Sequence, residues 1–357
     1  MVSEISIDTE KQQAFLEKVV SDLAGTMATY IASVGDRLGV FKDLAVNGPA
    51  NSKELASRVN LNERYAREWL RAMNSAGYLE FDSATGRFGL PPEHASVLAQ
   101  EGGPVFLAGA HEQIPAMWRP LEELITAFQT GGGVSQSSYD EHFWNGMQRF
   151  TDTWFENLLL QEWLPSVPDV QAKLERGARG ADVGCGRGKA LLKLAEAFPK
   201  SSFTGFDVHE PVVTQAMKNA ATAGLSERVN FQCLDVANGL PEKYDLITTF
   251  DVVHDMAEPS KALRAFHDGL APGGTYLMLE WACPENPEEN VGPMATFMYG
   301  YSIMYCVTTS LAQGGEGLGN LGLPESKVQD MCRDAGFTSI RKVPISSPLN
   351  SLYEIKV

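Results

Sequence analysis

The apolar residues near the start of the chain recur with the period of a helix. Across residues 11–46 an apolar side chain returns about every fourth position, which predicts a long helix. The residues that set this period are Phe15, Val19, Leu23, Met27 and Ile31. Two shorter helical stretches follow, and Asn51 and Asn62 stand where side chains cap helix N-termini. The pattern therefore predicts three consecutive helices.

The pattern then changes from helical to alternating. Residues 77–82 and 87–90 carry alternating apolar positions on either side of a turn at 83–86, which predicts a hairpin. Three helices followed by a hairpin form a winged helix. We expect residues 1–103 to be an N-terminal, mostly helical, winged-helix domain that serves in dimerisation.

Beyond this domain the chain is first helical and then of mixed type. Residues 104–176 are rich in aromatic side chains, are interrupted by three glycines, and are expected to be a helical connector that lines an acceptor pocket. From residue 177 short apolar runs alternate with helical stretches. This alternation predicts an α/β fold, a doubly wound Rossmann-like sheet that is mostly parallel with one antiparallel strand. The sheet domain is expected at 177–357, with an insert at 284–323.

Charge and cysteine content limit the classes of binding partner and the cellular compartment that we expect. The formal net charge is −16, and acidic residues outnumber basic ones even within the winged helix. Nucleic acids and anionic membranes both require a basic surface, so neither is an expected partner. Five scattered cysteines without a C-x-x-C pair indicate reduced thiols, and we expect a cytoplasmic protein without a metal site. No apolar run is long enough to cross a bilayer.

A glycine-rich run, Asp-Val-Gly-Cys-Gly-Arg-Gly at 182–188, lies between an expected strand and an expected helix. Glycines allow the backbone to approach a ligand closely, and the helix N-terminus lies just behind them. Further carboxylates follow at the ends of the next strands, at Asp207, Asp235 and Asp251. Because ligands bind at the carboxyl ends of parallel strands, we expect a nucleoside-containing cofactor there.

The glycine pattern separates two cofactor classes. A dinucleotide fingerprint needs a third glycine where this chain has Lys189, and Asp182 would repel a pyrophosphate. A nicotinamide oxidoreductase is therefore the disfavoured alternative. S-adenosylmethionine carries a sulfonium, an ammonium, a ribose and an adenine but no phosphate, and suits the carboxylates better.

These motifs, with Leu-Ala-Pro-Gly-Gly at 270–274, resemble those of class I S-adenosylmethionine-dependent methyltransferases over residues 177–357. The resemblance implies S-adenosylmethionine as methyl donor and S-adenosylhomocysteine as product. It implies that Asp182 holds the amino-acid end, Asp207 the ribose and Asp235 the adenine. The cofactor-binding residues expected here are Asp182, Gly184, Cys185, Gly186, Asp207, Val208, Asp235, Val236, Phe250 and Asp251.

His254 follows the fourth strand, facing the expected methyl donor. Transfer to a hydroxyl requires removal of its proton, which a neutral imidazole can accept. The chain is similar here to winged-helix O-methyltransferases that act on plant phenolics and related small metabolites, and to uncharacterised bacterial winged-helix methyltransferases. The resemblance implies that His254 is the general base and that Glu280 and Glu316 assist it. Met256 departs from the tryptophan common in that family.

Aromatic and apolar residues of the connector and the insert are candidates for the acceptor site, although a core or interface role is open for each. They are His111, His142, Phe143, Met147, Trp154, Met298 and Tyr301. The predicted function is methyl transfer to a small, aromatic or apolar, hydroxyl-bearing acceptor by a homodimer. The alternatives are N-, S- or C-methylation without base catalysis, and a cofactor-sensing winged-helix transcriptional regulator.

Overall fold

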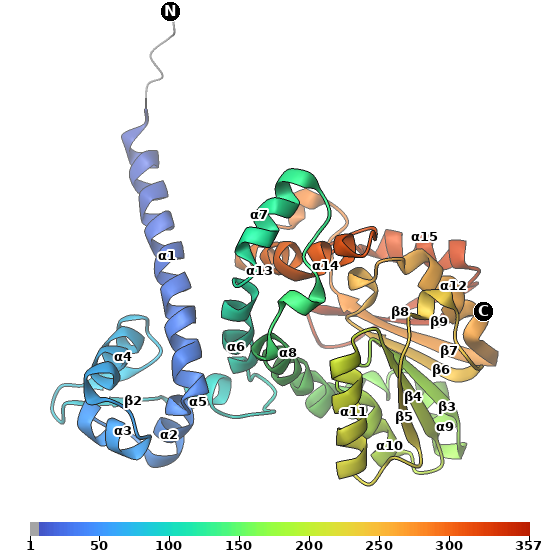
Figure 1. Ribbon diagram of the computed structural model, residues 1–357, viewed down its shortest axis with the longest axis horizontal. Helices are drawn as coiled ribbons and strands as arrows, with labels where there is room; N and C mark the ends of the chain where they lie inside the picture. Colours follow the sequence, from blue (N-terminus) through green and yellow to red (C-terminus); the bar gives the residue numbers. More distant parts are fainter. Residues whose placement is uncertain (1–6) are drawn as a thin grey trace, which may run out of the picture. The chain divides into compact units, whose positions relative to one another are not determined.

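The computed structural model describes residues 7–357, and the chain divides into two compact units (Figure 1). The first unit holds the residues up to 116 together with 141–153, and the second holds 117–140 and 154–357. In the described part of the chain no helix combines the length and apolarity that a membrane span needs.

The first unit contains a winged helix preceded by a long helix. Its elements are α1 (Thr9–Arg37), α2 (Val40–Asn47), α3 (Ser52–Arg58), α4 (Glu63–Ser75), β1 (Glu80–Asp82), β2 (Arg87–Gly89), α5 (Pro92–Leu98), α6 (Ala108–Met117) and α8 (Glu141–Trp154). The side chain of Asn51 accepts hydrogen bonds from backbone N–H groups in the first turn of α3, and Asn62 does the same for α4. Both caps are those predicted from the sequence.

The predicted helix at 11–46 is two helices in the structure. The chain turns between α1 and α2 at Gly39, whose φ of 72° is a left-handed conformation that glycine adopts without strain. Most apolar residues that suggested the long helix face solvent rather than a core. The exposed apolar residues of α1 and its C-cap are Phe15, Leu16, Val20, Leu23, Met27, Tyr30, Val34 and Leu38.

Two close contacts hold the first unit together. Trp69 of α4 donates its indole N–H to the carbonyl of Ile31 at 2.9 Å and packs on Gly35, where a Cβ would lie 2.2 Å from the ring. On α8, the guanidinium of Arg149 binds the carboxylates of three other segments. They are Asp36 at 2.6 Å, Glu101 at 2.7 Å and Glu112 at 2.9 Å. The arginine therefore ties α8 to α1 and α6 by buried ion pairs.

The second unit is built on a seven-stranded sheet with the order β5-β4-β3-β6-β7-β9-β8 (Figure 1). Its strands are β3 (Arg179–Val183), β4 (Ser202–Asp207), β5 (Val229–Cys233), β6 (Tyr244–Phe250), β7 (Leu270–Trp281), β8 (Ser339–Val343) and β9 (Asn350–Lys356). The first five are parallel neighbours, and β9 runs antiparallel to both β7 and β8. This is the mostly parallel sheet with one antiparallel strand that the sequence predicts.

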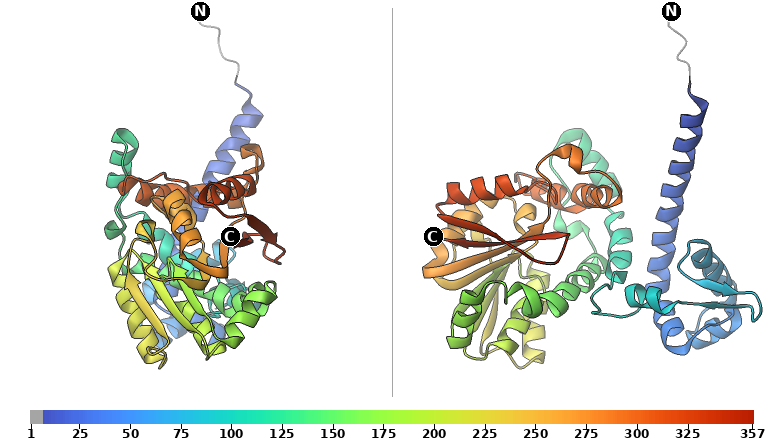
Figure 2. Two further views of the ribbon diagram at one scale, coloured as in Figure 1. Left: turned by 90° about the vertical axis from the view of Figure 1, so that its right-hand side faces the viewer. Right: turned by 180° about the vertical axis from the view of Figure 1, so that it is seen from behind.

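Helices cover both faces of this sheet (Figure 2). One face packs on α9 (Pro168–Arg176), α10 (Lys189–Ala197), α11 (Glu210–Thr222) and the π-helix η2 (Phe155–Trp163). The other packs on α12 (Pro259–Gly269) and α15 (Glu325–Ala335). The remaining helices are α7 (Leu121–Thr130), α13 (Pro293–Tyr301), the π-helix η6 (Ser302–Cys306) and α14 (Val307–Ala312). Four short 3₁₀ turns complete the second unit: η1 (Gln136–Ser138), η3 (Val236–Asn238), η4 (Val253–Asp255) and η5 (Pro287–Glu289).

The Ala-Pro-Gly-Gly segment at residues 271–274 lies inside β7. Tyr244 pairs with Leu270 and Leu246 with Thr275, so the longer run on β7 is accommodated as a bulge. Gly273 has a φ of 72° within it. A bulge accepts extra residues without ending the ladder, so the strand continues through the two glycines.

Candidate active site

The glycine loop joins β3 to α10, and its glycines have conformations that other residues rarely adopt. Gly184, Gly186 and Gly188 have φ values of 68°, 52° and 83°. A Cβ on Gly184 would lie 2.4 Å from Val252, whereas one on Gly186 would meet no atom within 4 Å. The loop is thus packed against the segment after β6 at Gly184 and open at Gly186, which leaves its backbone accessible to a ligand.

Asp182 lies in β3, fully surrounded by protein. Thr248 of the neighbouring strand β6 donates its hydroxyl to the Asp182 carboxylate at 2.7 Å. Burial raises the pKa of Asp182 to about 7, the Thr248 bond opposes this, and the charge of Asp207 adds to it. Thr248 was not singled out from the sequence, because a threonine within a strand carries no signal of its own.

Asp207 ends β4 and connects the strand to the glycine loop. Its carboxylate accepts from the backbone N–H of Gly186 at 3.0 Å and of His209 at 2.9 Å. Burial raises its pKa despite these bonds. Asp207 therefore helps to fix the loop conformation and has carboxylate lone pairs left for another donor.

Asp235 follows β5 and faces outward. It accepts from the N–H of Ala237 at 3.0 Å and caps η3, while its neighbour Val236 is buried. Because β3, β4 and β5 are adjacent and parallel, the three strand-end carboxylates share one edge of the sheet. Val208 is exposed beside Asp207, and the side chain of Cys185, which belongs to the glycine loop, is buried.

The residues on this edge fit S-adenosylmethionine. Asp182 and Asp207 are buried carboxylates whose pKa values are raised, and the factors that shift them include no lysine or arginine. A ligand carrying positive charge would satisfy them, and a pyrophosphate would not. Lys189, at the third glycine position of a dinucleotide fingerprint, pairs with Glu156 at 2.5 Å. Its charge is already neutralised by the protein.

His254 lies on η4, just beyond β6, and is 1% exposed. Its Nδ1 lies 2.6 Å from Oε2 of Glu280 on β7, which is equally buried. The other Glu280 oxygen accepts from the backbone N–H groups of Val253 at 2.8 Å and Val252 at 3.3 Å. A carboxylate can only accept, so Nδ1 carries the hydrogen and the lone pair of a neutral imidazole is on Nε2.

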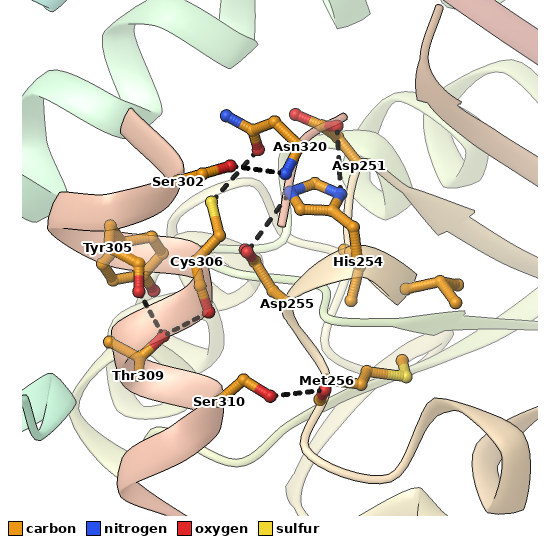
Figure 3. Close-up of polar contacts among 12 residues, drawn as sticks. Asp251, His254, Asp255, Met256, Ser302, Tyr305, Cys306, Thr309, Ser310 and Asn320 are labelled. Atoms are coloured by element: carbon orange, nitrogen blue, oxygen red, sulfur yellow. Dashed lines mark hydrogen bonds and ion pairs between the residues drawn. The ribbon is translucent and has the colours of Figure 1, made fainter. Parts of the chain in front are cut away.

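Two aspartates flank the same ring (Figure 3). Asp255 Oδ1 lies 3.2 Å from Nε2 of His254, and Asp251 Oδ1 lies 3.6 Å from Nδ1. Burial lowers the pKa of His254, but the charges of Asp255, Glu280 and Asp251 outweigh it and hold that pKa well above its usual range. The three carboxylates therefore favour the protonated form of the imidazole.

Asp251 is also unusual in its backbone. Its φ of 62° is in the left-handed region, which non-glycine residues seldom occupy. Burial raises its pKa well above the usual value, while His254 and a hydrogen bond with the Trp281 side chain lower it. The sequence assigns Asp251 to the cofactor, and the structure places it against the ring of His254. The preceding residue, Phe250, stacks on Trp163 with ring centroids 5.7 Å apart.

Glu316 does not join this cluster. Its side chain is exposed and accepts from the hydroxyl of Ser260 at 3.4 Å, while its backbone N–H donates to Ala257. The cluster instead includes two residues of the helical insert that the sequence did not indicate. Cys306 lies beside His254, and its thiol donates to Asn320 Oδ1 at 3.1 Å (Figure 3).

The expected acceptor-site residues divide between the two units. His111, His142, Phe143 and Met147 belong to the first unit, and Trp154, Met298 and Tyr301 to the second. The two histidines have partners in the first unit. His111 Nε2 is 3.2 Å from the Tyr78 hydroxyl, and His142 is 3.0 Å from Glu112 and 2.8 Å from Arg37.

The remaining candidates pack within their own units. The ring of Phe143 is 5.0 Å from that of Trp144 and fully buried. Trp154 is edge-on to Trp281, Met298 contacts Asn320 through its sulfur, and Tyr301 lies near Tyr305. Met147 is half-buried on α8. Their role in acceptor binding stays a prediction.

Comparison with known proteins agrees with this arrangement. Residues 26–100 match the family model described as "Rv2258c-like winged HTH domain", and residues 174–299 match "Methyltransferase domain". The chain is 23% identical over 77% of its length to a mitomycin biosynthesis 6-O-methyltransferase of Streptomyces lavendulae, of which it covers 80%. It is 30% identical over 37% of its length to a ubiquinone biosynthesis O-methyltransferase of Pseudomonas syringae pv. tomato, of which it covers 54%. It covers 25% of a further relative, an uncharacterised Synechococcus protein.

Solved structures share the fold over nearly the whole chain. The mitomycin 7-O-methyltransferase MmcR has a TM-score of 0.71 at 21% identity, covering 98% of this chain and 99% of its own. Human N-acetylserotonin methyltransferase in complex with SAM has a TM-score of 0.70 at 20% identity, covering 100% and 99%. These likenesses show the fold, and the family model over residues 174–299 shows that the sheet domain is a methyltransferase domain.

The chain therefore combines an N-terminal winged-helix domain with a methyltransferase domain. The predicted fold and the predicted methyltransferase class are confirmed.

Proposed function

We propose that the protein transfers a methyl group from S-adenosylmethionine to a hydroxyl oxygen of a small, aromatic or apolar molecule, with His254 as general base. The observation that carries the proposal is the buried contact of 2.6 Å between His254 Nδ1 and Glu280. The relatives named as O-methyltransferases of mitomycin and ubiquinone biosynthesis support oxygen as the methylated atom.

Glu280 prepares His254 for this role in two ways. It keeps the hydrogen on Nδ1, so that the Nε2 lone pair is the one that can accept a proton from the acceptor. It also binds the backbone N–H groups of Val252 and Val253, which fixes the loop that carries the imidazole. The negative charge then stabilises the imidazolium that forms when the hydroxyl is deprotonated.

The strand-end residues are proposed to hold the cofactor, which supplies an electrophilic methyl group when bound. We assign the ribose to Asp207, the adenine to Asp235 with Val236, and the amino-acid end to Asp182. The open backbone at Gly186 and the raised pKa values of the two buried carboxylates support this assignment.

The charge balance of the cluster links cofactor binding to base activity. Three carboxylates raise the pKa of His254 and favour its protonated form, whereas a general base must be neutral. The positive charge of a ligand bound by the strand-end carboxylates offsets part of the negative charge around His254. The pKa of His254 therefore falls. We infer that the base becomes competent when the methyl donor is bound, which limits proton transfer to the loaded enzyme.

A homodimer is proposed on the basis of α1. Eight large apolar side chains of this helix and its C-cap are exposed, far more than a solvated helix carries. A second copy of the chain would cover them, and sedimentation analysis of wild type against Leu23→Glu tests this. Cytoplasmic location and the domain bounds 1–103, 104–176 and 177–357 stay predictions.

The regulator alternative is less well supported. Arg64 and Arg67 of α4, the helix that would enter a major groove, pair with Glu68 and Glu63 on the same helix. Methylation of N, S or C remains the alternative for an acceptor without a hydroxyl. In that case His254 would orient the acceptor and take no proton.

The test is a screen of small phenols, amines and thiols with isotope-labelled S-adenosylmethionine and mass spectrometry of the products. With an active phenol, His254→Ala should lower kcat by ~10²–10⁴ while S-adenosylhomocysteine still binds in calorimetry. His267→Ala, at a half-buried histidine paired with Asp268, is the matched control. An undiminished kcat in His254→Ala would remove the imidazole from the role of base.

A further inference from the structure

Three different metal-binding side chains meet on the Nε2 side of His254. One donor atom from each of His254, Asp255 and Cys306 lies within 4.8 Å of the others. Imidazole nitrogen, carboxylate oxygen and thiolate sulfur together form a ligand set typical of Zn²⁺. We propose that these three residues bind a thiophilic divalent metal ion, and that the bound ion inhibits the enzyme.

The distances agree with a shared ion. Tetrahedral Zn²⁺ with bonds of about 2.0–2.3 Å separates its ligand atoms by roughly 3.3–3.6 Å. His254 Nε2 and Asp255 Oδ1 are 3.2 Å apart. Among the described residues this buried Asp255 oxygen accepts no hydrogen bond that meets the geometric criteria, and it contacts Nε2 as an ion-pair partner. The two atoms are placed as neighbouring ligands would be.

An outer set of contacts orients the ligands. Glu280 accepts from Nδ1 of His254 and so directs the Nε2 lone pair to the opposite side. Asn320 contacts the Cys306 sulfur at 3.1 Å and is itself held by the Ser302 hydroxyl at 2.7 Å (Figure 3). Carboxylate–histidine–metal arrangements of this kind are usual in metal sites, where the outer partner fixes the tautomer.

The local charge favours a cation. Three carboxylates surround His254, while the described contacts of the cluster include no lysine or arginine. On binding, the Cys306 thiol and Nε2 of the protonated His254 each lose a proton to solvent as the two bonds to the metal form, and no electron is transferred. The sequence predicts no metal site, because the three ligands come from one loop and from an insert about 50 residues further on.

The functional consequence rests on the proposed function. With its lone pair bound to the metal, Nε2 cannot take a proton from a hydroxyl acceptor. The ion therefore blocks methyl transfer while the strand-end residues that we assign to the cofactor remain free. Inhibition should follow metal occupancy and be reversed by a chelator.

The experiment measures binding and turnover separately on the full chain. Isothermal titration gives Zn²⁺ affinity, and Co²⁺ reports thiolate ligation through a charge-transfer band in the near ultraviolet. Wild type should bind a single equivalent of Zn²⁺ and show the band. Cys306→Ser should lose the band and more than about a hundredfold in affinity, beyond the loss typical of outer contacts. Cys233→Ser, at an exposed thiol, should match wild type.

Two results would overturn the site: Zn²⁺ affinity equal in Cys306→Ser and wild type, or a Co²⁺ complex without the thiolate band. Asp255→Asn provides a second variant should Cys306→Ser fold poorly, and S-adenosylhomocysteine binding checks the fold of each. Zn²⁺ bound as described without slower methyl transfer would refute inhibition and the base role of His254, and leave the site intact. Methyl transfer by a chain that binds no Zn²⁺ would refute the metal site and leave the proposed function intact.

Discussion

Replacement of Glu280 by glutamine isolates the charge from the shape of the side chain. Glu280 accepts from His254 Nδ1 at 2.6 Å and from Val253 N at 2.8 Å. A glutamine oxygen can keep the backbone bond, but its amide group then presents a donor to Nδ1. The imidazole must turn or move its hydrogen to Nε2, where it can no longer accept the acceptor's proton.

The expected loss follows from what general-base catalysis contributes. Removal of a correctly protonated base lowers kcat by ~10²–10⁴, which is about 3–5 kcal/mol of transition-state stabilisation. The pH profile should also change. Glu280 is one of the carboxylates that raise the pKa of His254, so the acid limb of kcat should move to lower pH in Glu280→Gln.

The assay is steady-state formation of S-adenosylhomocysteine across pH, with calorimetric binding of the same product as a check on the cofactor site. The matched control is Glu354→Gln, a buried glutamate of β9 that pairs with Arg341 and Lys356. This variant should keep the turnover of wild type. A Glu280→Gln enzyme with wild-type kcat and an unmoved acid limb would refute the reasoning.

Three further predictions concern the cofactor edge and the first unit. Asp182 is buried with a pKa of about 7, so the free energy of unfolding should fall by at most ~4 kcal/mol as pH rises from about 4 to about 7. Urea unfolding across this pH range should show a flatter slope in Asp182→Asn. Gly184→Ala should weaken S-adenosylhomocysteine binding in calorimetry because its Cβ meets Val252 at 2.4 Å, whereas Gly224→Ala, with a similar φ and open space, should not. Arg149→Met should lower stability by about 3–5 kcal/mol, seen as a lower Tm, because buried carboxylates lose their partner.

Much of the framework follows from local signals in the sequence. Asn51 and Asn62 are followed at once by helical patterns, and a short polar side chain at that position satisfies the free N–H groups of the first turn. Asp207 ends a short apolar run bounded by helical stretches, so its place at the carboxyl edge could be derived from strand–helix alternation alone.

The catalytic cluster could be predicted only in part. His254 and Glu280 lie at the ends of adjacent strands, which the alternation places side by side. Cys306 and Asn320 come from the insert, where no period fixes which side chains turn toward the sheet. The contact of Asp251 with the imidazole depends on a left-handed backbone at a non-glycine residue, which no composition or spacing indicates.

The sequence also does not show what covers the exposed apolar residues of α1. The helical period of its apolar residues indicates a helix but does not say what covers it. The spacing of the apolar residues is the same whether a second chain or the protein's own core covers them. The sequence therefore predicts helical structure here but not the end of α1 at Arg37, and the expected dimerisation stays a prediction.

Trp281 gives the protein an intrinsic optical probe. Its ring lies edge-on to that of Trp154, with centroids 5.5 Å apart, and its side chain bonds with Asp251 next to His254. Indole emission depends on the polarity and charge of such surroundings. Ligand entry can therefore be followed by tryptophan fluorescence in stopped-flow mixing without attaching a dye, and binding can be timed apart from product formation.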